Sequence, residues 1–290
     1  MSGTTLPVPA RSKPVGRVSA RLKTAGWTLA GILITGFMLF PLYWIVNISF
    51  SVQTDVLQNP PPFLPPHPTL DGYRAALSTA GGYIQSSFIY AMGTVVVTML
   101  VATPAAYALA TVRARIGSLL LVVLVLAQMA PGFVVANSLY SAFNNLGLLN
   151  SYLAVILADS TIAVPFAIII MRAFMIGLPR ELSEAARVDG AGTVRIFRSI
   201  YLPLSRTALI TAGLFSFLFG WGDFLFALIL NSNPDHTPIT VGIYRFIGAY
   251  SIEWPSVMAT AVIAVIPATV LLALAQRYIA AGITAGAVKE

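Results

Sequence analysis

Two acidic residues, Asp159 and Asp223, lie inside long apolar stretches of the sequence. An ionisable side chain is costly inside a membrane, so each is a functional candidate, and a carboxylate can accept hydrogen bonds from the hydroxyl groups of a solute. Trp221 precedes Asp223, and an aromatic ring beside a carboxylate commonly holds a sugar. Gln128 and Asn137 are further candidates for lining a solute path. Each of these side chains could instead form hydrogen bonds between helices or with a partner chain, which requires no solute.

The sequence lacks the patterns of an enzyme, a metal site or a nucleotide-binding site. His67 and His236 have no second histidine or acidic cluster nearby, so no metal site is expected. No nucleophile–base pair or paired-carboxylate pattern is present, which predicts that the chain is not an enzyme. It also lacks Gly-x-x-x-x-Gly-Lys-Ser/Thr, so it is not expected to bind ATP through a phosphate loop. No cofactor is expected on this chain. With 0 cysteines, disulfides and thiolate metal sites are excluded.

The segment from Leu178 to Pro203 has the signals of two short helices joined by a tight turn. Pro179 suits the first turn of a helix, where its missing amide would have no partner. The helix should end at Gly190, because glycine readily adopts the left-handed conformation of a helix cap. Thr193 can then cap a second helix that ends at Pro203. By composition alone, this segment could be an ordinary amphipathic connector at the membrane surface.

The spacing within this segment is more specific than its composition. Glu184-Ala-Ala is followed after three residues by Gly190 and after nine more by Ile200-x-Leu202-Pro203. This pattern resembles the EAA loop of the permease subunits of ATP-driven, binding-protein-dependent importers.

Further motifs along the chain are similar to carbohydrate-uptake permeases of the maltose-transporter type, especially the MalG-type partner. They are Ala105-Ala-Tyr-Ala-Leu-Ala110, Met129-Ala-Pro-Gly132, Leu146-Gly-Leu148, Trp221-Gly-Asp-Phe224 and Gly282-Ile-Thr-Ala-Gly-Ala-Val-Lys289. One departure is Gly222, where relatives commonly have asparagine, so the polar contacts of an asparagine side chain are not expected at that position.

The resemblance implies a division of labour among several chains. Two homologous permeases would form the pore, two cytoplasmic ATPases would bind ATP and Mg²⁺, and an external protein would deliver a sugar, or else glycerol phosphate or a polyol. Glu184 would reach a basic residue of the ATPase. The residues implied in ATPase coupling are Glu184, Ala185, Ala186, Asp189, Gly190, Ile200, Leu202, Pro203, Thr284 and Lys289.

Composition places the chain in a lipid bilayer. It is 57% apolar and 9% charged, whereas a soluble domain has about 25% charged residues. A helix needs about 20 apolar residues to cross roughly 30 Å of hydrocarbon, and six stretches satisfy this. The predicted spans are 27–48, 83–110, 117–140, 152–175, 207–230 and 257–279. The predicted fold is therefore all-α, a polytopic membrane protein with six transmembrane helices.

These spans divide the chain into a basic, disordered N-terminus (1–26), a transmembrane permease domain (27–280) and a C-terminal tail (281–290). The long connections between spans alternate between the two sides of the membrane. The external loops are 49–82, 141–151 and 231–256, and the EAA loop occupies the cytoplasmic connection 176–206.

The positions of lysine and arginine set the predicted orientation. If both termini face the cytoplasm, 15 of the 17 lysines and arginines fall on that side, as the positive-inside rule requires. Only Arg74 and Arg245 lie outside. The net charge of +7 therefore reflects membrane topology rather than a nucleic-acid partner. We expect a multi-pass protein of a bacterial inner membrane, in contact with lipid.

Two other classes of function fit the sequence less well. An ion-coupled secondary transporter could use Asp159 and Asp223, but its halves would show repeat symmetry, and no clear repeat is visible. A membrane enzyme would need a catalytic constellation that the sequence does not contain. Neither class explains the spacing of the EAA pattern.

Overall fold

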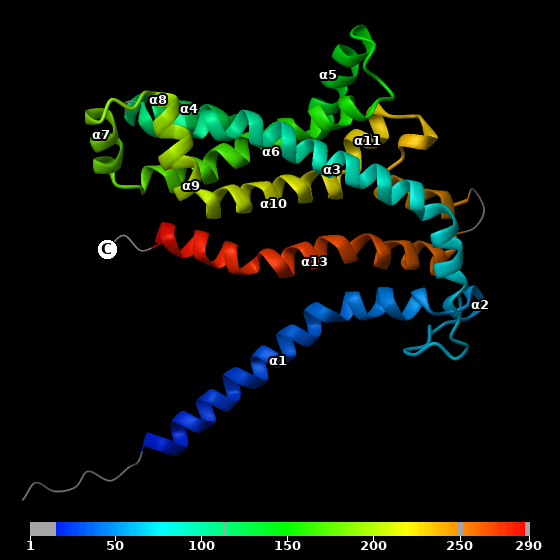
Figure 1. Cartoon of the computed structure of the whole chain (residues 1–290). Helices are drawn as coiled ribbons and strands as arrows, with labels where there is room; N and C mark the ends of the chain where they lie inside the picture. The colour runs from blue at the N-terminus through cyan, green and yellow to red at the C-terminus, as the bar shows by residue number, and fades with distance from the viewer. Residues whose placement is uncertain (1–15, 113, 249–251, 288–290) are drawn as a thin grey trace, which may run out of the picture.

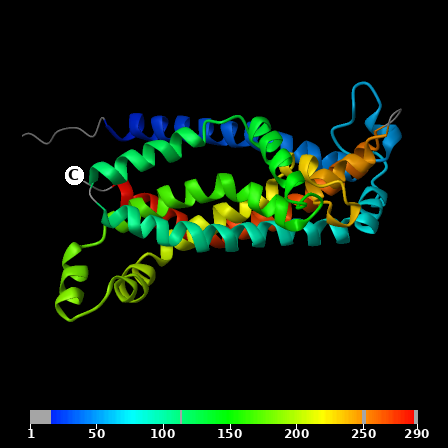
Figure 2. The same cartoon turned by 90° about the horizontal axis from the view of Figure 1, so that it is seen from above.

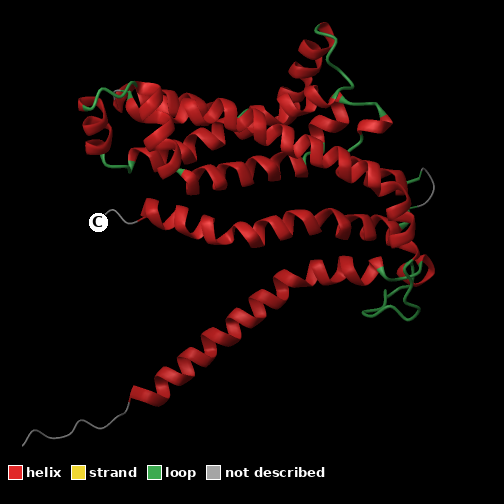
Figure 3. Cartoon of the chain, viewed as in Figure 1, coloured by secondary structure: helices red, strands yellow, loops and turns green. Residues whose placement is uncertain are grey.

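The computed structural model describes residues 16–112, 114–248 and 252–287. Within these ranges every regular element is a helix, apart from one isolated bridge between Ile247 and Ile252 (Figure 3). The predicted all-α fold is confirmed.

Three helices form the centre of the molecule: α3 (Asp71–Thr111), α6 (Tyr152–Ile176) and α10 (Arg206–Gly222) (Figure 1). Small residues allow their backbones to approach closely, as is usual between membrane helices. At Gly220 of α10, a Cβ atom would lie 2.9 Å from the Cα of Ala91 on α3, so a larger residue would push the two helices apart.

Two outer helices complete the bundle. α13 (Trp254–Ala287) packs along α3 and α10, and α1 (Gly16–Ser49) packs against α13. The N-terminal part of α1 diverges from α13 and stands away from the rest of the chain (Figure 1).

Four helical segments are long and apolar enough to cross a membrane as single helices: 24–49, 81–111, 152–176 and 254–276. The predicted third span is instead two helices, α4 (Ala114–Ala127) and α5 (Gly132–Asn145), which meet at 91°. Pro131 accounts for this break, because a proline disfavours a helical conformation in the residue before it.

The predicted fifth span is also interrupted. α10 ends at Gly222, and the short helix α11 (Leu225–Leu230) follows after Asp223 and Phe224. The prediction of a continuous helix over 207–230 was therefore wrong. No proline marks this break in the sequence. Among the described residues, the count of spans rises from four to six only if two bent pairs each count as one span: α4 with α5, and 193–204 with 206–222, which meet at 78°.

Several helices extend beyond the predicted spans. α1 begins at Gly16, so residues 16–26 of the predicted disordered N-terminus are helical, and residues 1–15 lie outside the described part. Helix α2 (Gln53–Val56) and the first turns of α3 occupy much of the predicted loop 49–82. Apolar composition predicts only the part of a helix that lies inside hydrocarbon, which explains why the predicted helices were shorter than the observed ones.

The connections gather at the two ends of the bundle (Figures 1 and 2). Helix α7 (Arg180–Val188) lies at the same end as the first residues of α1 and the last residues of α13. The opposite end holds α2, α11 and the connection that follows α11. That connection contains η2 (Pro234–His236), α12 (Ile239–Gly242) and η3 (Ile243–Phe246).

Candidate coupling site and solute path

Helix α7 ends in the predicted left-handed turn at Gly190, whose φ is +79°. The amide of Gly190 donates to the carbonyl of Arg187 at 3.0 Å, and the amide of Ala191 donates to that of Ala186 at 2.8 Å. These two bonds form a Schellman motif. Glu181 in the first turn and Arg187 in the last turn have the charges that favour the helix dipole. The turn is thus fixed by the backbone of the EAA sequence itself.

The second half of the loop differs from the prediction. Thr193 does not cap the next helix. Gly192 is the residue before α8 (Thr193–Ile196), and no side chain caps it. The helix continues through the π-helix η1 (Phe197–Tyr201) and α9 (Leu202–Leu204), one residue past Pro203. We call residues 180–204 the coupling segment.

The predicted coupling residues divide into an outer and an inner group. Glu184, Ala185, Asp189, Gly190 and Pro203 are exposed, whereas Ala186, Ile200 and Leu202 are half-buried. Of the inner group, Ala186 and Ile200 pack against a buried cluster of the helix core. The outer group therefore remains free for another chain.

Two exposed valines beside Gly190 were not predicted as site residues. Val188 is 88% exposed and Val194 is 66% exposed, so they flank the turn with apolar surface. The sequence could have indicated them, since each is an apolar residue between polar neighbours close to the expected turn. Thr284 lies in the last turns of α13, where side chains are not described, and Lys289 lies outside the described residues.

Asp223 caps the helix that follows it. Its two carboxylate oxygens accept hydrogen bonds from the amides of Phe226 at 3.1 Å and Ala227 at 2.8 Å. Its own carbonyl accepts a hydrogen bond from the hydroxyl of Thr240 in α12. The carboxylate thus satisfies amides that the break between α10 and α11 leaves free. Its predicted contact with solute stays a prediction.

Trp221 is buried, and its ring contacts the chain rather than an open space beside Asp223. The indole Nε1 donates to the carbonyl of Ala264 on α13 at 3.0 Å, and the ring stacks on Phe217 with centroids 5.7 Å apart. One edge of the residue lines a groove of about 760 Å³ between α3, α10 and α13. The structure therefore does not combine Trp221 and Asp223 into one open sugar site.

The other path candidates differ in burial and in their contacts. Asp159 of α6 is 2% exposed, and its Oδ2 has no hydrogen-bond partner among the described residues. Gln128, at the break between α4 and α5, donates from Nε2 to the carbonyl of Ile162 at 3.1 Å. Asn137 is exposed on α5. The structure places these three side chains on different elements, and their role in transport stays a prediction.

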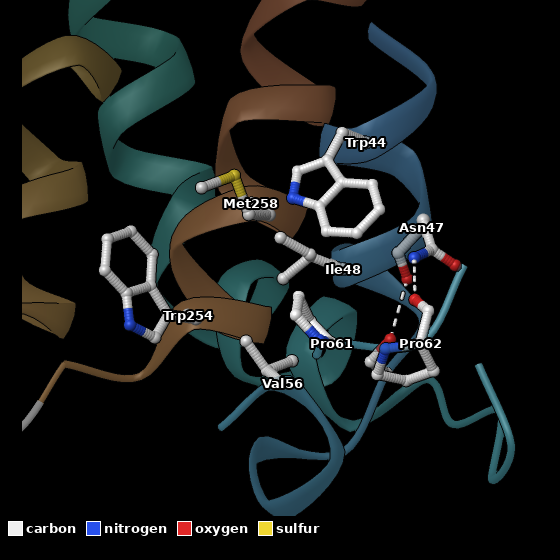
Figure 4. A pocket seen from close by; sticks show the side chains of 9 residues that line it. Trp44, Asn47, Ile48, Val56, Pro61, Pro62, Trp254 and Met258 are labelled. Atoms are coloured by element: carbon white, nitrogen blue, oxygen red, sulfur yellow. Dashed lines mark hydrogen bonds between the residues drawn. The ribbon is translucent and has the colours of Figure 1, made fainter. Parts of the chain in front are cut away.

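A separate pocket of about 310 Å³ lies at the end of the bundle opposite α7 (Figure 4). Trp44 of α1 and Trp254 of α13 stand on opposite sides of it, and the Nδ2 of Asn47 donates to the carbonyl of Pro62 at 3.1 Å. None of the predicted site residues lines this pocket. Its tryptophans suit the border between lipid and water.

Residues 102–285 match the family described as the inner membrane component of binding-protein-dependent transport systems. This chain belongs to that family. Family membership makes it a multi-pass inner membrane permease of an ABC importer rather than an enzyme, and it favours this function over an ion-coupled secondary transporter. The matched range contains the whole coupling segment.

Proteins of similar sequence cover nearly the whole permease. The sulfoquinovosyl glycerol transport system permease SmoH of Agrobacterium fabrum is 30% identical over 89% of this chain and 90% of its own length. The trehalose/maltose transport system permease MalG of Thermococcus litoralis is 32% identical over 90% and 95%. The trehalose transport system permease SugB of Mycobacterium tuberculosis is 32% identical over 91% and 97%.

The fold is also similar to solved structures. A chain of a bacterial ABC transporter that imports the acidic polysaccharide alginate superposes with a TM-score of 0.71, at 23% identity. The match covers 93% of this permease and 99% of that chain. The bent helices therefore belong to a fold already known in importers.

Proposed function

We propose that this permease forms part of the membrane path for a sugar or glycoside, and that ATP hydrolysis on partner ATPases drives the movement. The observation that supports this most is the exposed Gly190 turn, held by its Schellman motif and preceded on α7 by the exposed Glu184 and Val188. A rigid, exposed turn with apolar and acidic groups is suited to a cleft on another chain. ATP and Mg²⁺ would bind to the ATPases, with no cofactor on this chain.

The surface of α1 supports a second permease as a partner. From residue 24 to residue 43 this helix is largely apolar and nearly every residue is exposed, with Trp27 79% and Phe37 80% exposed. Membrane helices associate through packing and hydrogen bonds, and a helix that leaves its own bundle offers packing surface to another. A homologous permease would cover this surface, with lipid on the remainder.

The relatives support a sugar as the solute. Their names refer to sulfoquinovosyl glycerol, trehalose, maltose and diacetylchitobiose, all of which contain a sugar ring. An external solute-binding protein would deliver the solute, as in the alginate transporter that was solved with a pentasaccharide-bound periplasmic protein.

ATP hydrolysis by the complete complex in liposomes tests this proposal. The complex is mixed with each candidate binding protein, loaded with a disaccharide, a glycosyl glycerol, glycerol phosphate or a polyol. We expect stimulated hydrolysis and uptake with a sugar or glycosyl glycerol. Stimulation by glycerol phosphate or a polyol alone would overturn the sugar assignment, and ATP-independent uptake driven by an ion gradient would overturn the importer mechanism.

A further inference from the structure

The coupling segment contains one widened helical turn immediately before Pro203. η1 (Phe197–Tyr201) is a π-helix, a rare form that occurs mostly as single turns and often at functional sites. A proline ring inside a helix clashes with the carbonyl four residues earlier, which here belongs to Ser199. Widening the turn before the proline relieves this clash. Pro203 therefore accounts for the position of the π-turn.

Three aromatic rings join this turn to α3. The ring centroid of Tyr107 lies 5.1 Å from that of Phe197 and 4.8 Å from that of Tyr201. Tyr107 is 7% exposed and Tyr201 is 6% exposed, so the contact is shielded from solvent. Tilted and edge-to-face ring pairs add directional attraction to the burial of apolar surface. We call these three residues the aromatic clamp.

All three central helices meet at the aromatic clamp. The buried cluster around it includes Met171 and Met175 of α6 and Ala208 and Ala212 of α10. The methionines are 0% and 1% exposed, so this contact is closed to solvent. Close-packed interiors have low compressibility and transmit displacement, so a shift of the coupling segment must also displace the end of α3.

Movement of the coupling segment could also pass along the backbone into α10, but this connection is bent. The coupling segment enters α10 through Ser205 only after a bend of 78°. In contrast, α3 packs against α6, α10 and α13 along its length. A displacement received by α3 therefore reaches every helix of the bundle core.

We propose that Tyr107 is the positioning residue through which movement of the coupling segment reaches the membrane helices. Phe197 and Tyr201 hold its ring, and α3 distributes the movement. This inference rests on the proposed function, because an ATPase must move the coupling segment.

The amount of solute moved per ATP hydrolysed tests the role of the aromatic clamp. Tyr107→Leu and Phe197→Leu each remove one ring and retain an apolar side chain. We expect both variants to keep bound ATPase subunits and basal hydrolysis, while solute moved per ATP falls about tenfold. Tyr107→Phe retains the ring and should keep the parent ratio.

Phe215→Leu is the matched control. It removes a ring from the pair that Phe215 forms with Phe166, at 5.0 Å between centroids, joining α10 and α6 outside the coupling segment. Its ratio of transport to hydrolysis should match the parent. An equal fall in this control would overturn the proposal, because it would indicate a general effect of lost rings.

A parent-like ratio in both leucine variants would also overturn the proposal, and so would loss of the ATPase subunits from both. If Tyr107→Leu does not accumulate, Phe197→Leu gives the decisive result, since Phe197 is only half-buried. The unaltered complex is measured first. If it shows no ATP-driven uptake, the proposed function fails, and that result is distinct from a failure of the aromatic clamp.

Discussion

Among single residues, Asp223 is a predicted solute ligand whose carboxylate instead forms hydrogen bonds within the chain. Both of its carboxylate oxygens accept hydrogen bonds from amides at the start of α11. The sequence indicated an acid at membrane depth but not this contact, because the break in the helix occurs without a proline. The hydrogen bond from Trp221 to the carbonyl of Ala264 could not be predicted either, since these residues are 43 positions apart in the sequence.

Replacement of Asp223 separates capping from solute binding. Asp223→Ala removes both acceptors, and loss of a cap typically costs about 1–2 kcal/mol. We expect a lower yield of assembled complex from Asp223→Ala and a near-normal yield from Asp223→Asn, which retains one acceptor. Yield and solute-stimulated ATPase are measured on the same preparation. Normal yield with lost stimulation in both variants would show instead that the carboxylate acts on solute.

Among the helices, the sequence predicted where α7 ends. It did not predict the π-turn that follows or the breaks within two of the spans. Gly190 follows Asp189 at the end of a short amphipathic segment, and this local pattern predicted the turn that the structure contains. The π-turn was not predicted, because Pro203 was expected to end the helix rather than to widen the turn before it. Its ring contact with Tyr107 joins residues far apart in sequence, which no local pattern indicates. Likewise, apolar length predicted six spans but not the two breaks.

The helix end gives a matched pair of glycine variants. Gly190→Ala forces an alanine into φ of +79°, which costs about 1 kcal/mol of strain, although its Cβ would contact nothing within 4 Å. Gly192→Ala is the control, because φ there is −73° and the space is equally open. We expect Gly190→Ala to weaken ATPase-driven transport and Gly190→Asp to abolish it, with normal membrane insertion. Equal transport by the Gly190 and Gly192 variants would contradict the importance of this turn.

Across the whole molecule, the start of α1 and the end of α13 lie at the same end of the bundle as α7, which agrees with the predicted location of both termini on one side (Figures 1 and 2). Arginine and lysine counts predict that this side faces the cytoplasm. Reporters fused after residue 10 or residue 285 should therefore be active if they work in the cytoplasm and inactive if they work only outside it. Activity of a reporter that works only outside the cytoplasm would refute the orientation.

We propose that the turn at Gly190 contacts an ATPase, and a single-cysteine crosslink tests this contact. The chain has 0 cysteines, so Val188→Cys introduces one thiol beside the turn at a residue that is 88% exposed. Leu64→Cys, at a residue 72% exposed near the opposite end, is the matched control. In the assembled complex, a short thiol–amine crosslinker should join the Val188→Cys chain to the ATPase and leave the Leu64→Cys chain unlinked. A complex that retains its ATPase yet gives no crosslink from Val188→Cys would contradict the claim.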